Sequence, residues 1–312
     1  MHSVHQPVLL TEVLHYLNPK RNQQFIDATF GGGGHSAALL ERIGPDGRVL
    51  GIDLDPIADV FAGQFAPGQK KRLVLVEGNF KNIKRIAYDH NFTEVDGILL
   101  DLGLSSNQLQ DRTRGFSFLA DAPLNMRFGN DGQLTAADIV NEWSEQELTN
   151  LFTVYGEERL AKNIAKRIIA TRALGPLTTT EQLVDIVAGA YAKRFRGHSK
   201  VNPATKVFQA LRIAVNDELG NLAAVLPDAL ELLKLGGHLA VISYHSLEDR
   251  IVKNVFREAA QAYRAAPETP SGRVTKRPII KLVTKKPIVP TEAEQLQNPR
   301  SRSAKLRVAE KN

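Results

Sequence analysis

The segment FGGGGHS, residues 30–36, places four consecutive glycines and a histidine between an apolar run and an amphipathic one. Glycine lets the backbone approach a ligand closely and adopt a positive φ at no steric cost. A helix that opens after such a turn can hold a charged group of a nucleoside ligand through its backbone N–H groups. The dinucleotide fingerprint G-x-G-x-x-G would need glycine at Ser36, so it fails by one position.

Side chains suited to an adenosine-bearing ligand follow the next apolar runs. Asp53 ends the run VLGI, about 20 positions after the glycines, where a carboxylate typically holds ribose hydroxyls. Asp55 precedes Pro56, which predicts a helix cap for Asp55 and leaves Asp53 for the ligand. Phe80, after EGN, is placed to lie against an adenine ring. Asp101 ends the run DGILLD, and a carboxylate there needs a partner.

The composition limits the chemistry further. The chain has no cysteine, which excludes thiolate nucleophiles, disulfides and Cys-bound metals. Its eight histidines show no HExxH or comparable spacing, so we predict no metal. The residues themselves suit either a nicotinamide dinucleotide or S-adenosylmethionine, and the broken fingerprint favours S-adenosylmethionine.

The elements that must position these residues alternate along the first hundred positions. Short apolar runs separated by helical segments predict a doubly wound α/β fold with a mostly parallel sheet. The expected strands are 23–30, 48–55, 72–80 and 95–104, and the expected helices are 35–43, 56–64 and 81–90.

The alternation then stops. Only helical periodicity runs from about Leu134 to Leu226, where Ser144 with Glu147 and Thr178 with Glu181 fit capping boxes. The strand signal resumes at 236–244. We therefore expect an all-helical insertion, residues 111–215, within a discontinuous ligand-binding domain made of residues 1–110 and 216–312. Two apolar runs near the end, 279–284 and 304–310, are predicted to complete the sheet.

The net charge of +6 hides an uneven distribution. Residues 159–215 hold 11 Lys and Arg against 2 Asp and Glu, and residues 251–312 hold 14 against 5, so each region carries +9 and the rest of the chain −12. Two basic regions favour a polyanionic partner such as nucleic acid. Within the first, we expect Arg194, Arg196 and Lys200 to contact RNA. No apolar run is long enough to span a bilayer, so we expect a cytoplasmic protein with no membrane partner.

Motifs spread over nearly the whole chain resemble one family, the 16S ribosomal RNA (cytosine-N4)-methyltransferases, also called MraW or RsmH. The matching stretches are HQPVLLTEVL (5–14), IDATFGGGGHS (26–36), IDLDP (52–56), DGILLDLGLSSNQLQ (96–110), RGFSF (114–118), YGEER (155–159), FQALRIAVNDEL (208–219), ISYHSLEDRIVK (242–253) and NPRSRSAKLRVAE (298–310). They occur in the family's order, and together they are highly specific.

The resemblance implies a class I, Rossmann-like methyltransferase with an inserted helical domain that recognises the substrate. It implies that S-adenosylmethionine is the cofactor and that the substrate is a decoding-centre cytosine of 16S ribosomal RNA in the small subunit. By motif match, the cofactor contacts are Gly33, Gly34, His35, Asp53, Phe80, Asp101 and Gln108. The chain departs from the family at Asn125, where aspartate is usual, and at Asn107, where proline is common.

The residue that holds the target amine stays open. The DPPY-like tetrapeptide of many amino-methyltransferases is absent after the fourth expected strand, where DLGLSS stands. The candidates are Asp101, Asn125 and His245. Two other functions are kept as alternatives: a nicotinamide-dependent oxidoreductase on the same fold, and a non-catalytic RNA-binding assembly factor. The oligomeric state is also open, with a homodimer among the possibilities.

Overall fold

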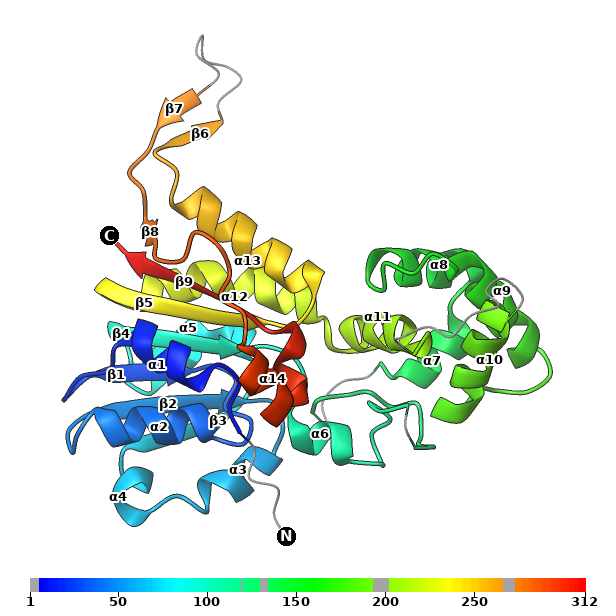
Figure 1. Ribbon diagram of the computed structural model, residues 1–312, viewed down its shortest axis with the longest axis horizontal. Coiled ribbons are helices and arrows are strands. Elements are labelled where there is room, and N and C mark those ends of the chain that lie inside the picture. Colours follow the sequence, from blue (N-terminus) through cyan, green and yellow to red (C-terminus); the bar gives the residue numbers. More distant parts are fainter. Residues whose placement is uncertain (1–5, 119, 130–133, 193–201, 266–272) are drawn as a thin grey trace. The chain divides into compact units, whose positions relative to one another are not determined.

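The computed structural model describes residues 6–118, 120–129, 134–192, 202–265 and 273–312. The chain divides into two compact units, drawn in Figure 1. We call Met1–Gly103 with Leu219–Asn312 the sheet unit, and Leu104–Glu218 the helical unit. Arg194, Arg196 and Lys200 lie outside the described residues.

The sheet unit is built on seven strands in the order β3-β2-β1-β4-β5-β9-β8. Strands β3 to β5 run parallel, whereas β9 is antiparallel to both β5 and β8. The expected doubly wound, mostly parallel sheet is therefore confirmed, and both carboxy-terminal runs join it. The bounds are β1 Gln24–Asp27, β2 Arg48–Asp53, β3 Leu73–Glu77, β4 Val95–Asp101, β5 Leu233–Ser243, β8 Ile280–Leu282 and β9 Lys305–Lys311.

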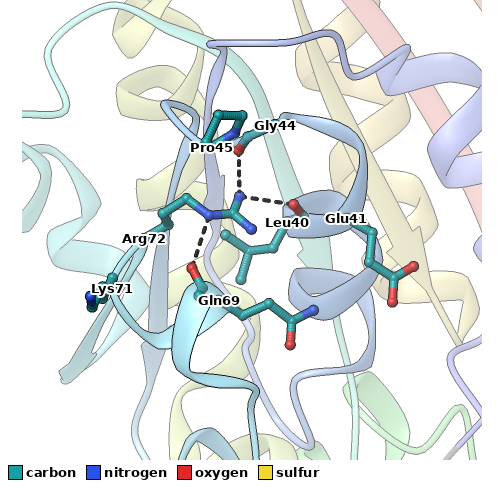
Figure 2. A pocket seen from close by; sticks show the side chains of 8 residues that line it. Leu40, Glu41, Gly44, Pro45, Gln69, Lys71 and Arg72 are labelled. Atoms are coloured by element: carbon teal, nitrogen blue, oxygen red, sulfur yellow. Dashed lines mark hydrogen bonds between the residues drawn. The ribbon is translucent and has the colours of Figure 1, made fainter.

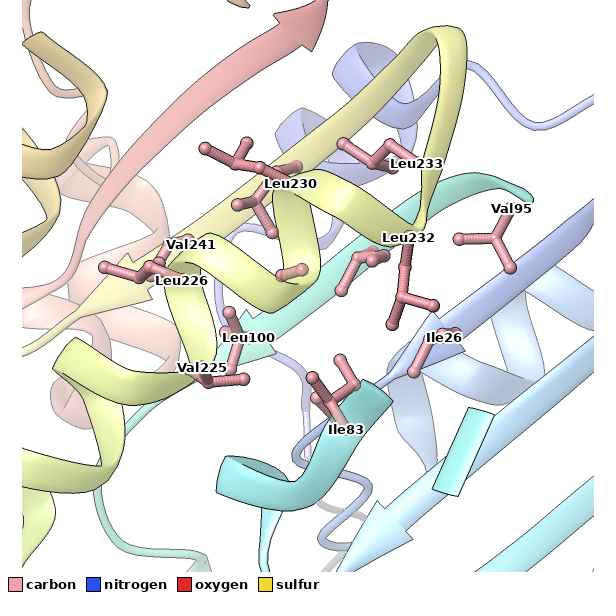
Figure 3. Close-up of a cluster of buried hydrophobic side chains, with 14 of the residues drawn as sticks. Ile26, Ile83, Val95, Leu100, Val225, Leu226, Leu230, Leu232, Leu233 and Val241 are labelled. Atoms are coloured by element: carbon pink, nitrogen blue, oxygen red, sulfur yellow. The ribbon is translucent and has the colours of Figure 1, made fainter. Parts of the chain in front are cut away.

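Helices cover both faces of this sheet because successive strand residues point to opposite sides. Ile26 packs under α5 (Ile83–Asp89), α12 (Glu218–Leu232) and α13 (Ser246–Ala259), in the cluster drawn in Figure 3. Its neighbour Phe25 packs on the other face, under α1 (Leu10–Leu17) and α2 (Gly34–Arg42). Both side chains are fully buried, and truncating a residue of this kind costs about 2–5 kcal/mol. Packing on both faces holds the strands in place between two layers of helices, and so fixes the positions of their carboxyl ends.

The remaining elements of the sheet unit are short. The sequence predicts the helices at 56–64 and 81–90, which the structure confirms as α3 and α5, but it does not predict α1 or α4. The further bounds are α3 Ile57–Ala62, α4 Pro67–Lys70, η1 Phe80–Asn82, β6 Tyr263–Ala265, β7 Arg273–Thr275, α14 Glu292–Gln297 and η2 Pro299–Ser303.

The helical unit has its own core, to which α7 to α11 all contribute. Where the structure describes this stretch, the expectation of helices without strands is correct, and Ser144 caps α8 with Glu147 as predicted. The box at Thr178 is wrong, because α10 begins at Thr180 and it is Gln182 Oε1 that accepts from the Thr178 backbone N–H. The bounds are α6 Ser106–Gln110, α7 Ala136–Glu142, α8 Glu145–Val154, α9 Ala161–Arg172, α10 Thr180–Ala192 and α11 Ala204–Asn216. Among the described helices, none has the length and apolarity needed to cross a bilayer.

Candidate cofactor site

Three carboxylates stand at the carboxyl ends of three adjacent parallel strands. Asp27 ends β1, Asp53 ends β2 and Asp101 ends β4, and β1 lies between the other two strands. This edge, where the strand order reverses, is the place where open α/β sheets bind ligands. The sequence pointed to Asp53 and Asp101. Asp27 follows the same pattern, because it is a carboxylate directly after the apolar pair Phe25–Ile26, but it is not among the predicted site residues.

Asp53 ties the glycine turn to the end of β2. Its Oδ2 accepts a hydrogen bond from the Gly31 N–H at 2.6 Å, and its Oδ1 accepts from the Asp55 N–H at 2.8 Å. Burial raises the pKa of Asp53 from 3.8 to about 6, although both hydrogen bonds oppose this. The carboxylate is therefore held in a costly charged form at neutral pH, and a ligand that offers donors or positive charge would relieve that cost.

Asp27 lies deeper, with 1% of its surface exposed. Its Oδ2 accepts from Ser36 Oγ at 2.7 Å, so it holds the first turn of α2. Burial raises the pKa of Asp27, and the nearby His35 acts in the opposite direction. Asp27 therefore acts beneath this edge mainly as an anchor for the first turn of α2.

Asp101 is held from two sides. Its Oδ1 accepts from the Tyr244 hydroxyl at 2.7 Å, and its backbone N–H donates to Thr29 Oγ1 at 2.6 Å. Its Oδ2 lies 3.4 Å from His35 Nε2. His35 is 6% exposed, and neither ring nitrogen has a hydrogen-bond partner of good geometry within the described structure. A buried imidazole of this kind points to a missing partner, because buried polar atoms are ordinarily satisfied.

The glycine turn needs glycine for two different reasons. Gly31 and Gly33 have φ of +52° and +75°, in the left-handed region. At Gly31 a Cβ would meet only one backbone oxygen, at 3.8 Å, so this position is open to a ligand. At Gly33 a Cβ would lie 2.7 Å from the Phe30 ring, and at Gly34 it would overlap Pro7. The expectation that the glycines serve close ligand approach therefore fits Gly31, whereas Gly33 and Gly34 make room for the protein's own side chains.

Segments from both ends of the sequence meet at this turn. The Leu9 N–H donates to Glu294 Oε1 of α14 at 2.8 Å, and Asn298 Nδ2 donates to the Gln6 carbonyl at 3.1 Å. Pro7, between these two anchors, packs against Gly34. Pairing across almost the whole chain length leaves no signal in local periodicity, so sequence reasoning missed it.

Other predicted residues of the sheet unit have structural contacts. Asp55 caps α3, with Oδ1 accepting from the Ile57 N–H at 3.2 Å, as expected. Phe80 is partly buried and packs against the core. His245 caps α13, and its Nε2 lies 3.3 Å from Glu248 Oε1. A capping imidazole at the end of β5 remains available as a candidate because its Nε2 has no hydrogen bond of good geometry in the described residues.

Two predicted residues belong to the helical unit. Gln108 caps α6, with its Oε1 accepting from the Ser105 N–H at 3.0 Å. Asn125 Oδ1 accepts from Arg127 Nε at 2.9 Å and from its backbone N–H at 3.2 Å. The side-chain oxygen of Asn125 therefore fixes the position of Arg127. An aspartate at this position would make the same contacts with a full negative charge.

The donor set fits S-adenosylmethionine better than a nicotinamide dinucleotide. Two further carboxylates, Asp55 and Asp27, add to the rise in the pKa of Asp53. Such an edge attracts a ligand bearing a sulfonium and an ammonium, and it repels a pyrophosphate with two negative charges. Asp53 can accept from ribose hydroxyls, and the open backbone at Gly31 suits close approach.

A hollow near Arg72 lies at the opposite edge of the sheet. It is lined by residues that follow α2 and precede β3, including Pro45 and Lys71. Figure 2 shows the Arg72 guanidinium inside it, where Nη1 donates to the carbonyls of Leu40 at 2.8 Å and Gly44 at 2.7 Å. These bonds satisfy carbonyls at the end of α2, so the hollow marks a helix cap rather than a ligand site.

The chain is similar over nearly its whole length to the members of one family. Residues 2–312 match the family described as the MraW methylase family. The "Ribosomal RNA small subunit methyltransferase H" of Thermomicrobium roseum is 50% identical over 309 residues, which are 99% of this chain and 94% of the relative. The protein of the same name from Heliobacterium modesticaldum is 49% identical over 98% of both chains. A solved rRNA methylase from Streptococcus thermophilus covers 99% of both chains at 10% identity, with a TM-score of 0.43.

Proposed function

Since the chain belongs to the MraW methylase family, we propose that it methylates the exocyclic N4 of a decoding-centre cytosine in 16S ribosomal RNA of the small subunit. The chain is a methyltransferase and its cofactor is S-adenosylmethionine. The relatives' name supports small-subunit ribosomal RNA as the substrate.

The observation that carries the proposal is the row of carboxylates at Asp27, Asp53 and Asp101 beside the glycine turn. When bound, S-adenosylmethionine supplies an electrophilic methyl group on a positively charged sulfur. Asp53 would accept from its ribose, and the N–H groups in the first turn of α2 would hold its carboxylate. The Asp101 carboxylate would favour its positive charges. The bound cofactor would also give the buried His35 imidazole the hydrogen-bond partner that it lacks in the described structure.

The acceptor atom follows from the absence of cysteine. Methylation at carbon 5 of a pyrimidine normally requires a cysteine that adds to the ring, and the chain has none. The accepting atom must therefore bring its own lone pair, as the cytosine amine does. Holding that amine in line requires acceptors for its hydrogens and a site for the proton it loses.

Asp101 is the first choice for this acceptor. Its carboxylate stands at the end of β4 and is kept in place by Tyr244. His245 lies one residue beyond that tyrosine and offers an imidazole nitrogen. Asn125 can act only as a neutral hydrogen-bond partner, because an amide cannot take up a proton at neutral pH. We retain all three as candidate catalytic residues, and Arg194, Arg196 and Lys200 as candidate phosphate contacts.

Tritium transfer from labelled S-adenosylmethionine to undermethylated small subunits tests the proposal. Counts are expected in the small-subunit RNA with the wild-type protein, and few with Asp53→Ala. The absence of transfer to RNA from any small-subunit preparation would refute the substrate assignment. Binding of a nicotinamide dinucleotide in preference to S-adenosylmethionine would instead refute the interpretation of the carboxylate row.

A further inference from the structure

A second group of basic residues lies in the sheet unit, on the side of the sheet where β9 and β8 are the outer strands. Between residues 253 and 286 the sequence holds nine Lys and Arg against two Glu. The described, exposed members come from α13 and from the segments that flank β8, and we call them the carboxy-terminal basic surface. They are Lys253, Arg257, Arg277, Lys281, Lys285 and Lys286.

The surface contains cations without counter-charges. Lys281 pairs with Glu310 at 3.2 Å. Arg277, Lys285 and Lys286 are exposed, and no carboxylate of the described chain forms an ion pair with them. Surface lysines and arginines that do not serve internal pairing contribute an external positive potential. The net charge of the chain outside the two basic regions is −12. The positive potential is therefore confined to the basic regions.

A small hairpin precedes the segment that carries these cations, and its second strand β7 ends at Thr275, two residues before Arg277. Strands β6 and β7 pair only with each other and form no part of the seven-stranded sheet. In Figure 1 they extend beyond the end of α13. An isolated two-stranded hairpin is at best marginally stable in water. Its Tyr263 is 54% exposed, so the ring contributes little to any core of the protein itself.

We propose that the carboxy-terminal basic surface binds phosphates of ribosomal RNA and that Tyr263 stacks on an unpaired base. Unpaired cations and an exposed aromatic ring on one unit are the groups that bind single-stranded nucleic acid. An acidic protein partner would satisfy the cations, but it would leave the ring without the base on which to stack. The inference rests on the proposed function in taking the polyanion to be ribosomal RNA, and it adds a contact surface outside the helical unit.

The test compares two sets of three substitutions in the full-length protein, with transcribed small-subunit ribosomal RNA as the probe. The first set is Arg277→Gln, Lys285→Gln and Lys286→Gln. Losing three phosphate contacts should lower the slope of log affinity against log salt by about 2, and weaken binding at physiological salt by about 10- to 50-fold. The dissociation constant for S-adenosylmethionine should not change, because these residues lie outside the carboxylate edge.

The matched control removes the same charge elsewhere on the sheet unit, through Lys20→Gln, Lys70→Gln and Lys71→Gln, all exposed. It should leave the salt slope at the wild-type value. A single Tyr263→Ala substitution should weaken RNA binding by about 5- to 150-fold with little change in slope, since stacking carries no charge.

Equal slopes for the two triple variants would overturn the proposal. So would a change from dimer to monomer in sedimentation of the first variant with RNA binding unchanged, because the surface would then serve self-association. Failure of the proposed function has a different signature. In that case the wild-type protein would bind RNA through this surface and yet transfer no methyl group to it.

Discussion

Replacing Asp53 with asparagine should stabilise the cofactor-free protein at neutral pH while it weakens the binding of S-adenosylmethionine. Burial raises the pKa of the Asp53 carboxyl group from 3.8 to about 6. The folded state therefore binds this proton more tightly than the unfolded state does, and stability falls as the pH rises from about 4 to about 6. A shift of about two units corresponds to about 3 kcal/mol lost by pH 7.5.

Asparagine removes this cost but also one hydrogen-bond acceptor. Asp53 accepts from the N–H groups of Gly31 and Asp55, and losing one such bond costs about 1 kcal/mol. The net gain in the free energy of unfolding is then about 2 kcal/mol at pH 7.5. It should shrink to about 0.5 kcal/mol at pH 5, where much of the wild-type carboxylate is already protonated in the folded state.

Chemical denaturation of both proteins at the two pH values measures this difference, and calorimetry measures cofactor affinity. The affinity should fall by about 10- to 150-fold, which is the loss of hydrogen bonds to a charged group. A variant that is less stable than the wild type at pH 7.5, or equally stabilised at both pH values, would refute the buried-charge reasoning. Normal affinity would refute the ribose assignment.

Four further predictions use the same two measurements. Asp55→Ala should lower stability by about 1 kcal/mol through the lost helix cap, with normal cofactor affinity. Gly33→Ala should destabilise by about 2 kcal/mol or more, because its Cβ adds overlap to the cost of a positive φ. Gly31→Ala should cost only about 1 kcal/mol yet weaken cofactor binding. Glu294→Ala should reduce cofactor affinity by releasing the amino-terminal segment, whereas the exposed Glu292→Ala serves as its control.

Each of these has a clear contrary result. A Gly33→Ala protein as stable as the wild type would show that the Phe30 and Phe65 rings leave room for a Cβ there. Loss of cofactor affinity in Asp55→Ala, with normal binding in Asp53→Asn, would reverse the two aspartate roles. A Gly31→Ala protein that binds the cofactor normally would mean that no ligand approaches there. Equal affinities for Glu294→Ala and Glu292→Ala would show that α14 does not position the amino-terminal segment.

Local patterns predicted most of the sheet because each strand is a short apolar run between helical segments. The same logic placed Asp53 and Asp101 at strand ends, where the structure has them. It also separated Asp55, a cap, from Asp53, and the structure confirms that cap.

What local patterns could not give are contacts between distant segments. Position 34 must be glycine because a Cβ there would overlap Pro7. Pro7 is in turn held in place by hydrogen bonds to residues nearly 300 positions away in sequence. The hydrogen bond from Tyr244 to Asp101 joins residues 143 positions apart in sequence, and the local sequence around either residue does not predict it. Thr178 and Glu181 fit a capping box by type, but a helix that starts two residues later places Gln182 there instead.

The position of the methyl group on its product tests the central claim most directly. Small-subunit RNA methylated by the protein is digested to nucleosides, and the products are identified by mass spectrometry against standards. The chain has no cysteine to activate carbon 5, and its buried carboxylates suit a cationic donor beside an amine acceptor. The account predicts N4-methylcytidine, preferentially from cytosines that are unpaired or can be turned out of a stack. Recovery of 5-methylcytidine would contradict the chemical argument, and a 2′-O-methylated nucleoside would contradict the proposed acceptor.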